Sequence, residues 1–320
     1  MISAAAPAGL DKAASFKRSD VIPGDAGRSR DDHQRSRRCQ PSDSVHPFEP
    51  QYVPATALRA RRVQLPRALR EFGNSEHASA PFLGIGDPVL TGAAGRTTSV
   101  TLASLFRGAT ADVEKVRALP PLPETAAELH AIAKTLGASE ADLLLGARAS
   151  EPVLGQMSLD RYRIIEFATH GLVSGELKGL TEPALVLTPP AQARSDDDGL
   201  LTASEIATLK LNADWVVLSA CNTAAGDGTP DGGGLSGLAK AFFYAGARSL
   251  LVSHWRAWSG ATVKLTTGTF AELASDPSIG RAEALRRAMM AMLDPQSSPE
   301  FAHPLAWATF VLAGEGGAGR

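Results

Sequence analysis

From about Pro81 onward, short apolar runs alternate with segments whose apolar residues recur at helical spacing. Short runs rich in β-branched and aromatic residues are typical of buried strands, and the segments between them are typical of helices that cover a sheet. This alternation predicts an α/β fold with a mainly parallel sheet. The predicted strands are Phe82–Gly86, Tyr162–Ala168, Ala184–Leu187, Trp215–Ala220, Ser249–Ser253 and Trp307–Leu312.

Three of the intervening segments carry a clear helical stripe. Apolar residues three, four and seven positions apart lie on one face of a helix, and a glycine just beyond them is a common helix end. The stripes are Leu129–Leu136 before Gly137, Leu235–Phe242 before Gly246, and Leu285–Met292. A further helix is predicted to start at Ser204, because serine is a good N-cap residue.

Residues 1–46 differ in composition from the rest of the chain. The run from Arg28 to Arg38 contains almost no apolar side chain, and the first 70 residues hold 13 Lys and Arg against 7 Asp and Glu. Such a segment cannot bury enough apolar surface to offset the entropy lost on ordering. We therefore expect residues 1–46 to be a basic, disordered tail and residues 47–320 to form one domain. A nucleic-acid-binding arm is the alternative, although the interleaved aromatic residues that would favour it are missing.

Composition excludes several classes of function. The formal net charge is −2, which gives no general attraction to nucleic acid or to an acidic membrane. Cys39 and Cys221 are too few for a disulfide framework or a cysteine-rich zinc site. No apolar run reaches the roughly 18 residues that a membrane span needs. We expect a cytoplasmic protein without a metal or cofactor, in which Cys221 is a free thiol.

Two predicted strands end in reactive side chains. Tyr162–Ala168 leads to His170 and Gly171, and Trp215–Ala220 leads directly to Cys221. Catalytic groups of parallel sheets gather beyond the carboxyl ends of the strands, so the imidazole and the thiol are expected to face each other. An imidazole can generate the thiolate that attacks a carbonyl carbon, and the N–H groups of Gly171 and Cys221 are candidate donors to the resulting oxyanion.

Each of these residues also has a simpler interpretation. A lone cysteine at a strand end is often a small buried hydrophobe, and a histidine there often only caps the sheet. His254 also follows a predicted strand and is the main rival to His170 as the base. The pairing of thiol and imidazole at neighbouring strand ends favours catalysis.

Four ordered motifs resemble the CHAT domain, a family of caspase-like cysteine peptidases related to separases and gingipains. The motifs are Phe167–Gly171, Val216–Thr223, Gly237–Ala247 and Ser253–Trp255, and the similarity extends over roughly residues 48–316. The resemblance implies a three-layer α/β/α sandwich and an endopeptidase with His170 as base and Cys221 as nucleophile. It also implies a protein or peptide substrate, a bacterial origin and a tetratricopeptide-repeat or other regulatory partner. An inactive caspase-like interaction module is the alternative function.

The resemblance further implies a substrate pocket around Asp231, Ser253, Trp255 and Arg256. Family members carry an acidic residue near the position of Asp231, which is expected to substitute for it from a shifted position. A second acidic position of the family is occupied by Trp258. The guanidinium of Arg256 is expected to select Asp or Glu before the cleaved bond through a paired charge contact. The alternative is that Arg256 faces solvent and an acidic residue selects a basic side chain.

Overall fold

The computed structural model describes residues 78–92, 106–107, 110–172, 182–220, 237–255, 258–294 and 296–317. Within them the main element is a six-stranded sheet in the order β11-β10-β9-β5-β1-β4. Its neighbouring strands run parallel, except that β11 pairs antiparallel with β10. The strands are β1 (Ala80–Gly86), β4 (Leu143–Leu145), β5 (Tyr162–Ala168), β9 (Trp215–Leu218), β10 (Ser249–Ser253) and β11 (Phe310–Gly314).

Shorter strands and the helices complete the described residues. An antiparallel pair is formed by β2 (Phe106–Arg107) and β3 (Thr110–Ala111), and a second antiparallel sheet by β6 (Gly171–Leu172), β7 (Ala184–Val186) and β8 (Leu200–Thr202). The helices are α1 (Val113–Arg117), α2 (Pro123–Leu136), α3 (Glu151–Gly155), α4 (Ala203–Thr208), α5 (Gly237–Ala245), α6 (Ser259–Ser275), α7 (Arg281–Met292) and α8 (Pro304–Trp307). Single 3₁₀ turns lie at Glu140–Asp142, Gly146–Arg148, Leu159–Arg161 and Pro299–Ala302.

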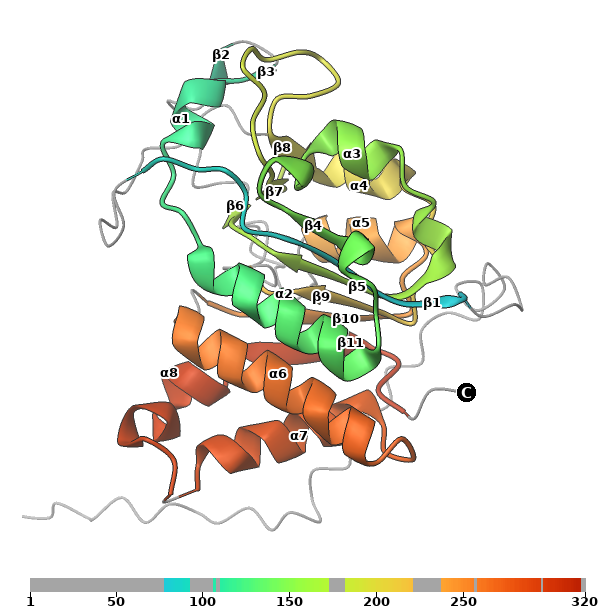
Figure 1. Cartoon of the computed structure of the whole chain (residues 1–320), viewed down its shortest axis with the longest axis vertical. Helices are drawn as coiled ribbons and strands as arrows, with labels where there is room; N and C mark the ends of the chain where they lie inside the picture. Colours follow the sequence, from blue (N-terminus) through green and yellow to red (C-terminus); the bar gives the residue numbers. More distant parts are fainter. Residues whose placement is uncertain are drawn as a thin grey trace, which may run out of the picture. The chain divides into compact units, whose positions relative to one another are not determined.

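Helices cover both faces of the main sheet (Figure 1). On one face α3, α4 and α5 pack on the sheet, and the ring of Phe167 from β5 lies 5.4 Å from that of Phe242 in α5. On the other face lie α2, α6, α7 and α8, and Trp215 from β9 contacts Phe270 of α6 at 5.1 Å. Side chains of a strand alternate between faces, so each central strand supplies both cores. The α/β class with a mainly parallel sheet between helical layers is confirmed.

Local sequence explains where the elements begin and end. Helix α2 starts with Pro123, whose missing N–H costs nothing in a first turn, and ends at Gly137 with φ of 67°. Helix α4 is capped by Thr202, whose side chain accepts from the N–H of Glu205 while Glu205 reaches back to Thr202. The prediction that Ser204 caps this helix is therefore wrong by two residues, because the reciprocal capping box is stronger than a single serine.

Several boundaries differ from the sequence prediction. Ala184–Val186 is a strand, but it belongs to the separate antiparallel sheet with β6 and β8. Strand β11 starts at Phe310, because Pro304 opens the short helix α8 just before it. Helix α6 was not predicted, since its threonine-rich face conceals the helical period. The remaining predicted strands correspond to β1, β5, β9 and β10, although β9 ends at Leu218, two residues before the predicted end. The predicted stripes correspond to α2, α5 and α7, and Leu235 lies outside the described residues.

Glu151 at the start of α3 holds the turn that leads into β8. Its carboxyl oxygen accepts hydrogen bonds from the N–H groups of Gly199 at 2.8 Å and Asp198 at 3.2 Å. Burial, and to a lesser degree the nearby carboxylate of Glu205, raise the pKa of Glu151 to about 8. The folded protein therefore keeps a proton on Glu151 at a pH where the unfolded chain releases it.

Glu151→Gln is expected to stabilise the protein at neutral pH. Glutamine keeps a carbonyl oxygen for the two N–H donors and removes the cost of charging, and each unit of raised pKa corresponds to about 1.4 kcal/mol. The contribution of the protonated Glu151 to the free energy of unfolding is fully present below about pH 4.5 and is lost as pH rises through about 8. Denaturant unfolding of both proteins at pH 5, 6.5 and 8 should show a shallower decline in the free energy of unfolding for the variant. Parallel curves would contradict the assignment.

Candidate active site at the carboxyl ends of the central strands

Strands β5 and β9 are hydrogen-bonded parallel neighbours in the centre of the sheet. Their register pairs Ile165 with Val216 and Phe167 with Leu218. His170 lies three residues beyond Phe167, and Cys221 stands three residues beyond Leu218 in the sequence. The two chain segments therefore leave the sheet at the same edge from neighbouring strands. Cys221 itself lies outside the described residues.

The ring of His170 is oriented by a backbone carbonyl. Its Nε2 lies 2.8 Å from the carbonyl oxygen of Pro120, which precedes α2 in the chain. A carbonyl oxygen only accepts, so Nε2 carries the proton and donates it. The neutral ring then has its lone pair on Nδ1, the atom that can accept a proton. The fixed tautomer makes His170 a suitable general base.

The backbone around His170 is held by strand β7. The N–H of Val186 donates to the carbonyl oxygen of His170 at 2.9 Å, and the hydroxyl of Thr169 donates to the carbonyl of Val186 at 2.5 Å. Gly171 and Leu185 are therefore a non-hydrogen-bonded pair of the antiparallel ladder, in which the backbone N–H of each residue points away from the partner strand. The N–H of Gly171 therefore points away from β7 and takes no part in that strand pair.

The end of β9 is fixed from both sides. The hydroxyl of Ser253, at the end of β10, donates to the carbonyl oxygen of Ala220 at 2.5 Å. The hydroxyl of Ser219 donates to the carboxyl oxygens of Glu128 in α2 at 3.1 and 3.3 Å. Ser219 and Ala220 are the two residues before Cys221. The chain segment that leads to Cys221 is therefore held by a neighbouring strand and by a helix.

The predicted pocket residues fall into different environments. Ser253 is fully buried and supports Ala220, whereas Trp255 is half-buried. The indole Nε1 of Trp255 is buried and has no hydrogen-bond partner among the described residues. Asp231 and Arg256 lie outside those residues, so their place in a pocket stays a prediction.

His254, the rival base, is exposed and stacks on the ring of Trp255 at 6.1 Å. Its backbone N–H donates to the carbonyl of Thr309 at 2.9 Å, which fastens the end of β10 to the segment before β11. The hydroxyl of Thr309 in turn donates to the carbonyl of Leu305 in α8. This chain of bonds places α8 beside the end of β10.

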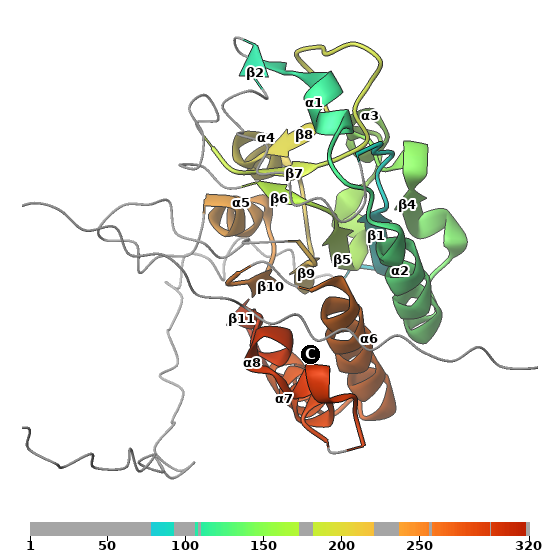
Figure 2. The same ribbon diagram turned by 90° about the vertical axis from the view of Figure 1, so that its left-hand side faces the viewer.

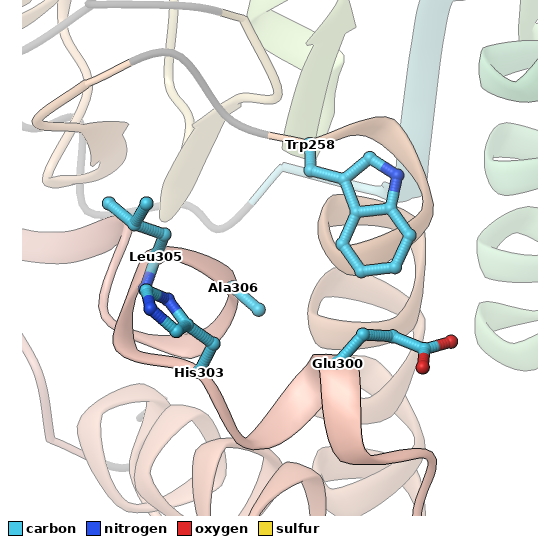
Figure 3. A pocket seen from close by; sticks show the side chains of 5 residues that line it. All are labelled: Trp258, Glu300, His303, Leu305 and Ala306. Atoms are coloured by element: carbon cyan, nitrogen blue, oxygen red, sulfur yellow. The ribbon is translucent and has the colours of Figure 1, made fainter. Parts of the chain in front are cut away.

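A hollow of about 410 Å³ opens between the start of α6 and α8 (Figure 3). Trp258 and Leu305 lie on opposite sides of it, with Ala306 between them. Both large side chains are solvent-exposed, Trp258 at 48% and Leu305 at 60%. Phe301 stacks behind Trp258 at 5.1 Å and holds its ring in place. In the sequence, Trp258 was notable only because it occupies a position where the family carries an acidic residue. The hollow could not be predicted, because its other side is formed by α8.

Charged residues were also missed where they are deeply buried. Glu128 and Glu166 are 1% and 0% exposed, although the sequence places them in an amphipathic helix and an apolar strand. The visible signal was a glutamate inside the otherwise apolar run Ile164–Ala168. Across the described ranges, no group of three His, Cys, Asp or Glu side chains is arranged to hold a metal ion. Nor does any helix in those ranges have the length and apolar character needed to cross a bilayer.

Comparisons with known proteins agree with the motifs. The family model described as CHAT domain matches residues 44–315. Tetratricopeptide repeat protein 28 of Mus musculus is 29% identical over 228 residues, which cover 61% of this chain and 9% of that protein. The Homo sapiens protein of the same name is equally similar, with 8% of its length covered. The chain therefore spans less than a tenth of these relatives.

Solved structures with a similar course of the chain include two of a gingipain. The Arg-specific cysteine proteinase gingipain R is 10% identical with a TM-score of 0.43, covering 76% of this chain and 49% of that one. A complex of Porphyromonas gingivalis RgpB pro- and mature domains is 9% identical with a TM-score of 0.44, covering 79% and 52%.

Proposed function

Because the chain belongs to the CHAT domain family, we propose that it is a cysteine endopeptidase that uses His170 as base and Cys221 as nucleophile. The observation that supports the proposal is the register of β5 with β9, in which Phe167 pairs with Leu218, because His170 and Cys221 each follow one of these two residues by three positions in the sequence. The described geometry of His170 supports the role, since its proton is committed to the carbonyl of Pro120 and Nδ1 is the basic atom.

The reaction follows from these groups. Nδ1 of His170 takes the thiol proton, and the thiolate of Cys221 attacks the peptide carbonyl carbon. The N–H groups of Gly171 and Cys221 stabilise the oxyanion, each with a contribution of roughly 3 to 4 kcal/mol. The imidazolium then protonates the leaving amine as the C–N bond breaks. Water hydrolyses the thioester, giving its proton to His170, and the free carboxylic acid and thiol are restored.

The biological setting is proposed from the thiol chemistry, the family resemblance and the named relatives. A free thiol nucleophile is maintained in a reducing compartment, which supports a cytoplasmic location, and the family resemblance supports a bacterial origin. The two relatives named as tetratricopeptide repeat proteins support regulation by such a repeat partner. The second candidate is an interaction module without turnover. It is favoured by Trp258 and Asp231, which depart from the family pattern in the pocket loops.

Cys221→Ala and His170→Ala are each expected to abolish peptide cleavage while the fold is kept. The nucleophile and the base act as one unit, so the double variant should be no worse than the more damaged single variant. Turnover of a protein substrate, with circular dichroism of each variant, provides the measurement.

A thiol-directed peptide electrophile separates the two candidate functions. It should attach to Cys221 in the wild-type protein and not in His170→Ala, with Cys39→Ser as the labelling control. Near-wild-type cleavage by either single variant would refute the dyad. Failure of the wild-type protein both to cleave and to label would favour the interaction module.

The residue before the cleaved bond is expected to be acidic. A guanidinium in a partly desolvated pocket pairs with a carboxylate through charge-assisted hydrogen bonds, and Arg256 directly follows the pocket residue Trp255. Profiling a peptide library at neutral pH should show preference for Asp or Glu, and Arg256→Asp should shift it toward Lys or Arg. Efficient cleavage after basic or apolar residues by the wild-type protein would exclude this role for Arg256 and leave the dyad untouched.

The hollow of Trp258 and Leu305 is proposed to receive an apolar side chain of the substrate. Strands β10 and β11 are two and three positions from β5 in the sheet. At a spacing of about 4.8 Å this places the end of β10 and the start of β11 roughly 10 to 14 Å from the end of β5. An extended peptide advances about 3.3 Å per residue, so the side chain would lie about three or four residues from the cleaved bond.

Leu305→Ala is expected to raise KM about tenfold for a peptide with leucine or phenylalanine at that distance, because about 1.5 kcal/mol of apolar contact is lost. The value of kcat should change little, and a shorter peptide that cannot reach the hollow should be cleaved equally by both proteins. Met290→Ala removes a similarly exposed apolar side chain from α7 and serves as the matched control. An unchanged KM in Leu305→Ala would contradict the assignment.

A further inference from the structure

Two glutamates meet in the interior on the side of the sheet covered by α2 and α6, helices that lie side by side in both views (Figures 1 and 2). Glu128 comes from α2 and Glu166 from β5, and both are almost completely buried. A buried carboxylate is costly unless hydrogen bonds or a counter-charge compensate for the lost water. The contacts around the two carboxyl groups therefore decide what form they take.

The two carboxyl groups have unequal partners. Glu128 accepts a hydrogen bond from the hydroxyl of Ser219, and its carboxyl oxygen lies 2.5 Å from the hydroxyl of Thr266, whose single proton is shared with the carbonyl of Thr262 at 2.9 Å. Neither carboxyl oxygen of Glu166 has a hydrogen-bond partner among the described residues, and Glu128 is the carboxyl group whose charge acts on it. Two carboxylates cannot hydrogen-bond to each other, because both only accept. A hydrogen bond between them requires a proton on one, and the donors to Glu128 place that proton on Glu166.

The surroundings contain no compensating positive charge within the described ranges. Glu166 is in register with Gly84 on β1 and Val217 on β9, and α6 contributes the hydroxyl of Thr266. Burial raises the pKa of both carboxyls, and the charge of Glu128 raises that of Glu166 further. No described Lys, Arg or His side chain acts on the pKa of either group. Two charges side by side in this interior would repel each other, so the pair is stable with one carboxyl protonated and the other charged.

The pair touches both catalytic segments. Glu166 lies on β5, four residues before His170 in the sequence. Ser219 directly follows β9 and precedes Cys221 by two residues. We propose that Glu128 and Glu166 share one proton and together act as positioning residues that hold the ends of β5 and β9 in catalytic register. This inference rests on the proposed function, because it assigns these residues to the placement of that dyad.

The arrangement predicts sensitivity to alkaline pH. The unfolded chain releases the proton of Glu166 near pH 4.5, whereas the folded protein retains it well above that value. The stability from this group is therefore fully present below about pH 4.5 and is lost as pH rises through the folded pKa. Once the shared proton leaves, two like charges repel in the core and separate the segments that they joined.

The first experiment counts the proton and does not depend on peptide cleavage. Over pH 6 to 8 the equilibrium constant for denaturant unfolding should rise about tenfold more per pH unit for the wild-type protein than for Glu166→Gln. The amide introduced by this substitution donates an N–H to Glu128 and carries no titrating proton. Glu128→Gln removes the repelling charge and should flatten the pH dependence in part, because burial alone still raises the pKa of Glu166, and it replaces the first variant if that one does not fold. Equal pH dependence in the wild-type protein and the folded variants would overturn the inference.

The second experiment measures positioning through the rate at which a peptide electrophile labels Cys221 in a Cys39→Ser background. Thr266→Val removes a donor to Glu128 and should slow labelling at least fivefold, with a loss that grows as pH rises. Thr269→Val is the matched control, since Thr269 is buried in the same helix and donates to its own backbone at Leu265. Glu166→Gln should label at the wild-type rate at pH 6 and faster than wild type at pH 9.

The outcomes of the second experiment are distinct. Equal slowing by Thr266→Val and Thr269→Val would show a general packing effect and overturn the positioning role. So would Glu166→Gln labelling that falls with pH to the same extent as in the wild type. Normal labelling without peptide turnover in the wild-type protein would instead count against the peptidase proposal and leave the carboxyl pair intact.

Discussion

The parallel hydrogen bonding of β5 to β9 is the constraint on which the site depends. Because the pair is central in the sheet and buried on both faces, its register cannot slip without moving apolar side chains of both cores. The segments beyond Phe167 and Leu218 therefore emerge together, whatever the sequence of the loops that follow. A rigid strand pair supplies the placement, and the loops are left to determine what is bound.

Polar contacts then refine what the register establishes. The carbonyl of Pro120 orients the ring of His170, and Ser253 and Glu128 secure the two residues before Cys221. These groups come from separate elements, so the site is assembled by packing of the whole domain and not by one local motif. The same logic explains a carboxyl pair in an apolar interior. Its hydrogen bonds are directional, whereas apolar side chains in its place would fill the volume without specifying a position.

The sequence predicted the fold well where one periodicity dominates a segment. Tyr162–Ala168 and Ser249–Ser253 are strands with the predicted bounds. Each run is short and mostly apolar, and a strand between two helical layers buries both of its faces. It failed where tertiary contacts decide. Helix α6 buries Thr262, Thr266 and Thr269, so its inner face does not look apolar in the sequence. The hydroxyls of Thr266 and Thr269 bond within the helix or to Glu128.

The candidate site shows the same division. His170 and its strand end were predicted from residue type and position, because a reactive side chain after a buried strand is an unusual combination in any α/β sequence. Trp258 could not be placed, since its hollow requires Leu305, some 47 residues later in the chain, to form the opposite wall. Glu128 and Glu166 could not be paired either, because 38 residues separate them and only the packing of α2 across β5 joins them. The residue that follows a strand can be read from the local sequence, whereas the residues that contact it are determined by the tertiary fold.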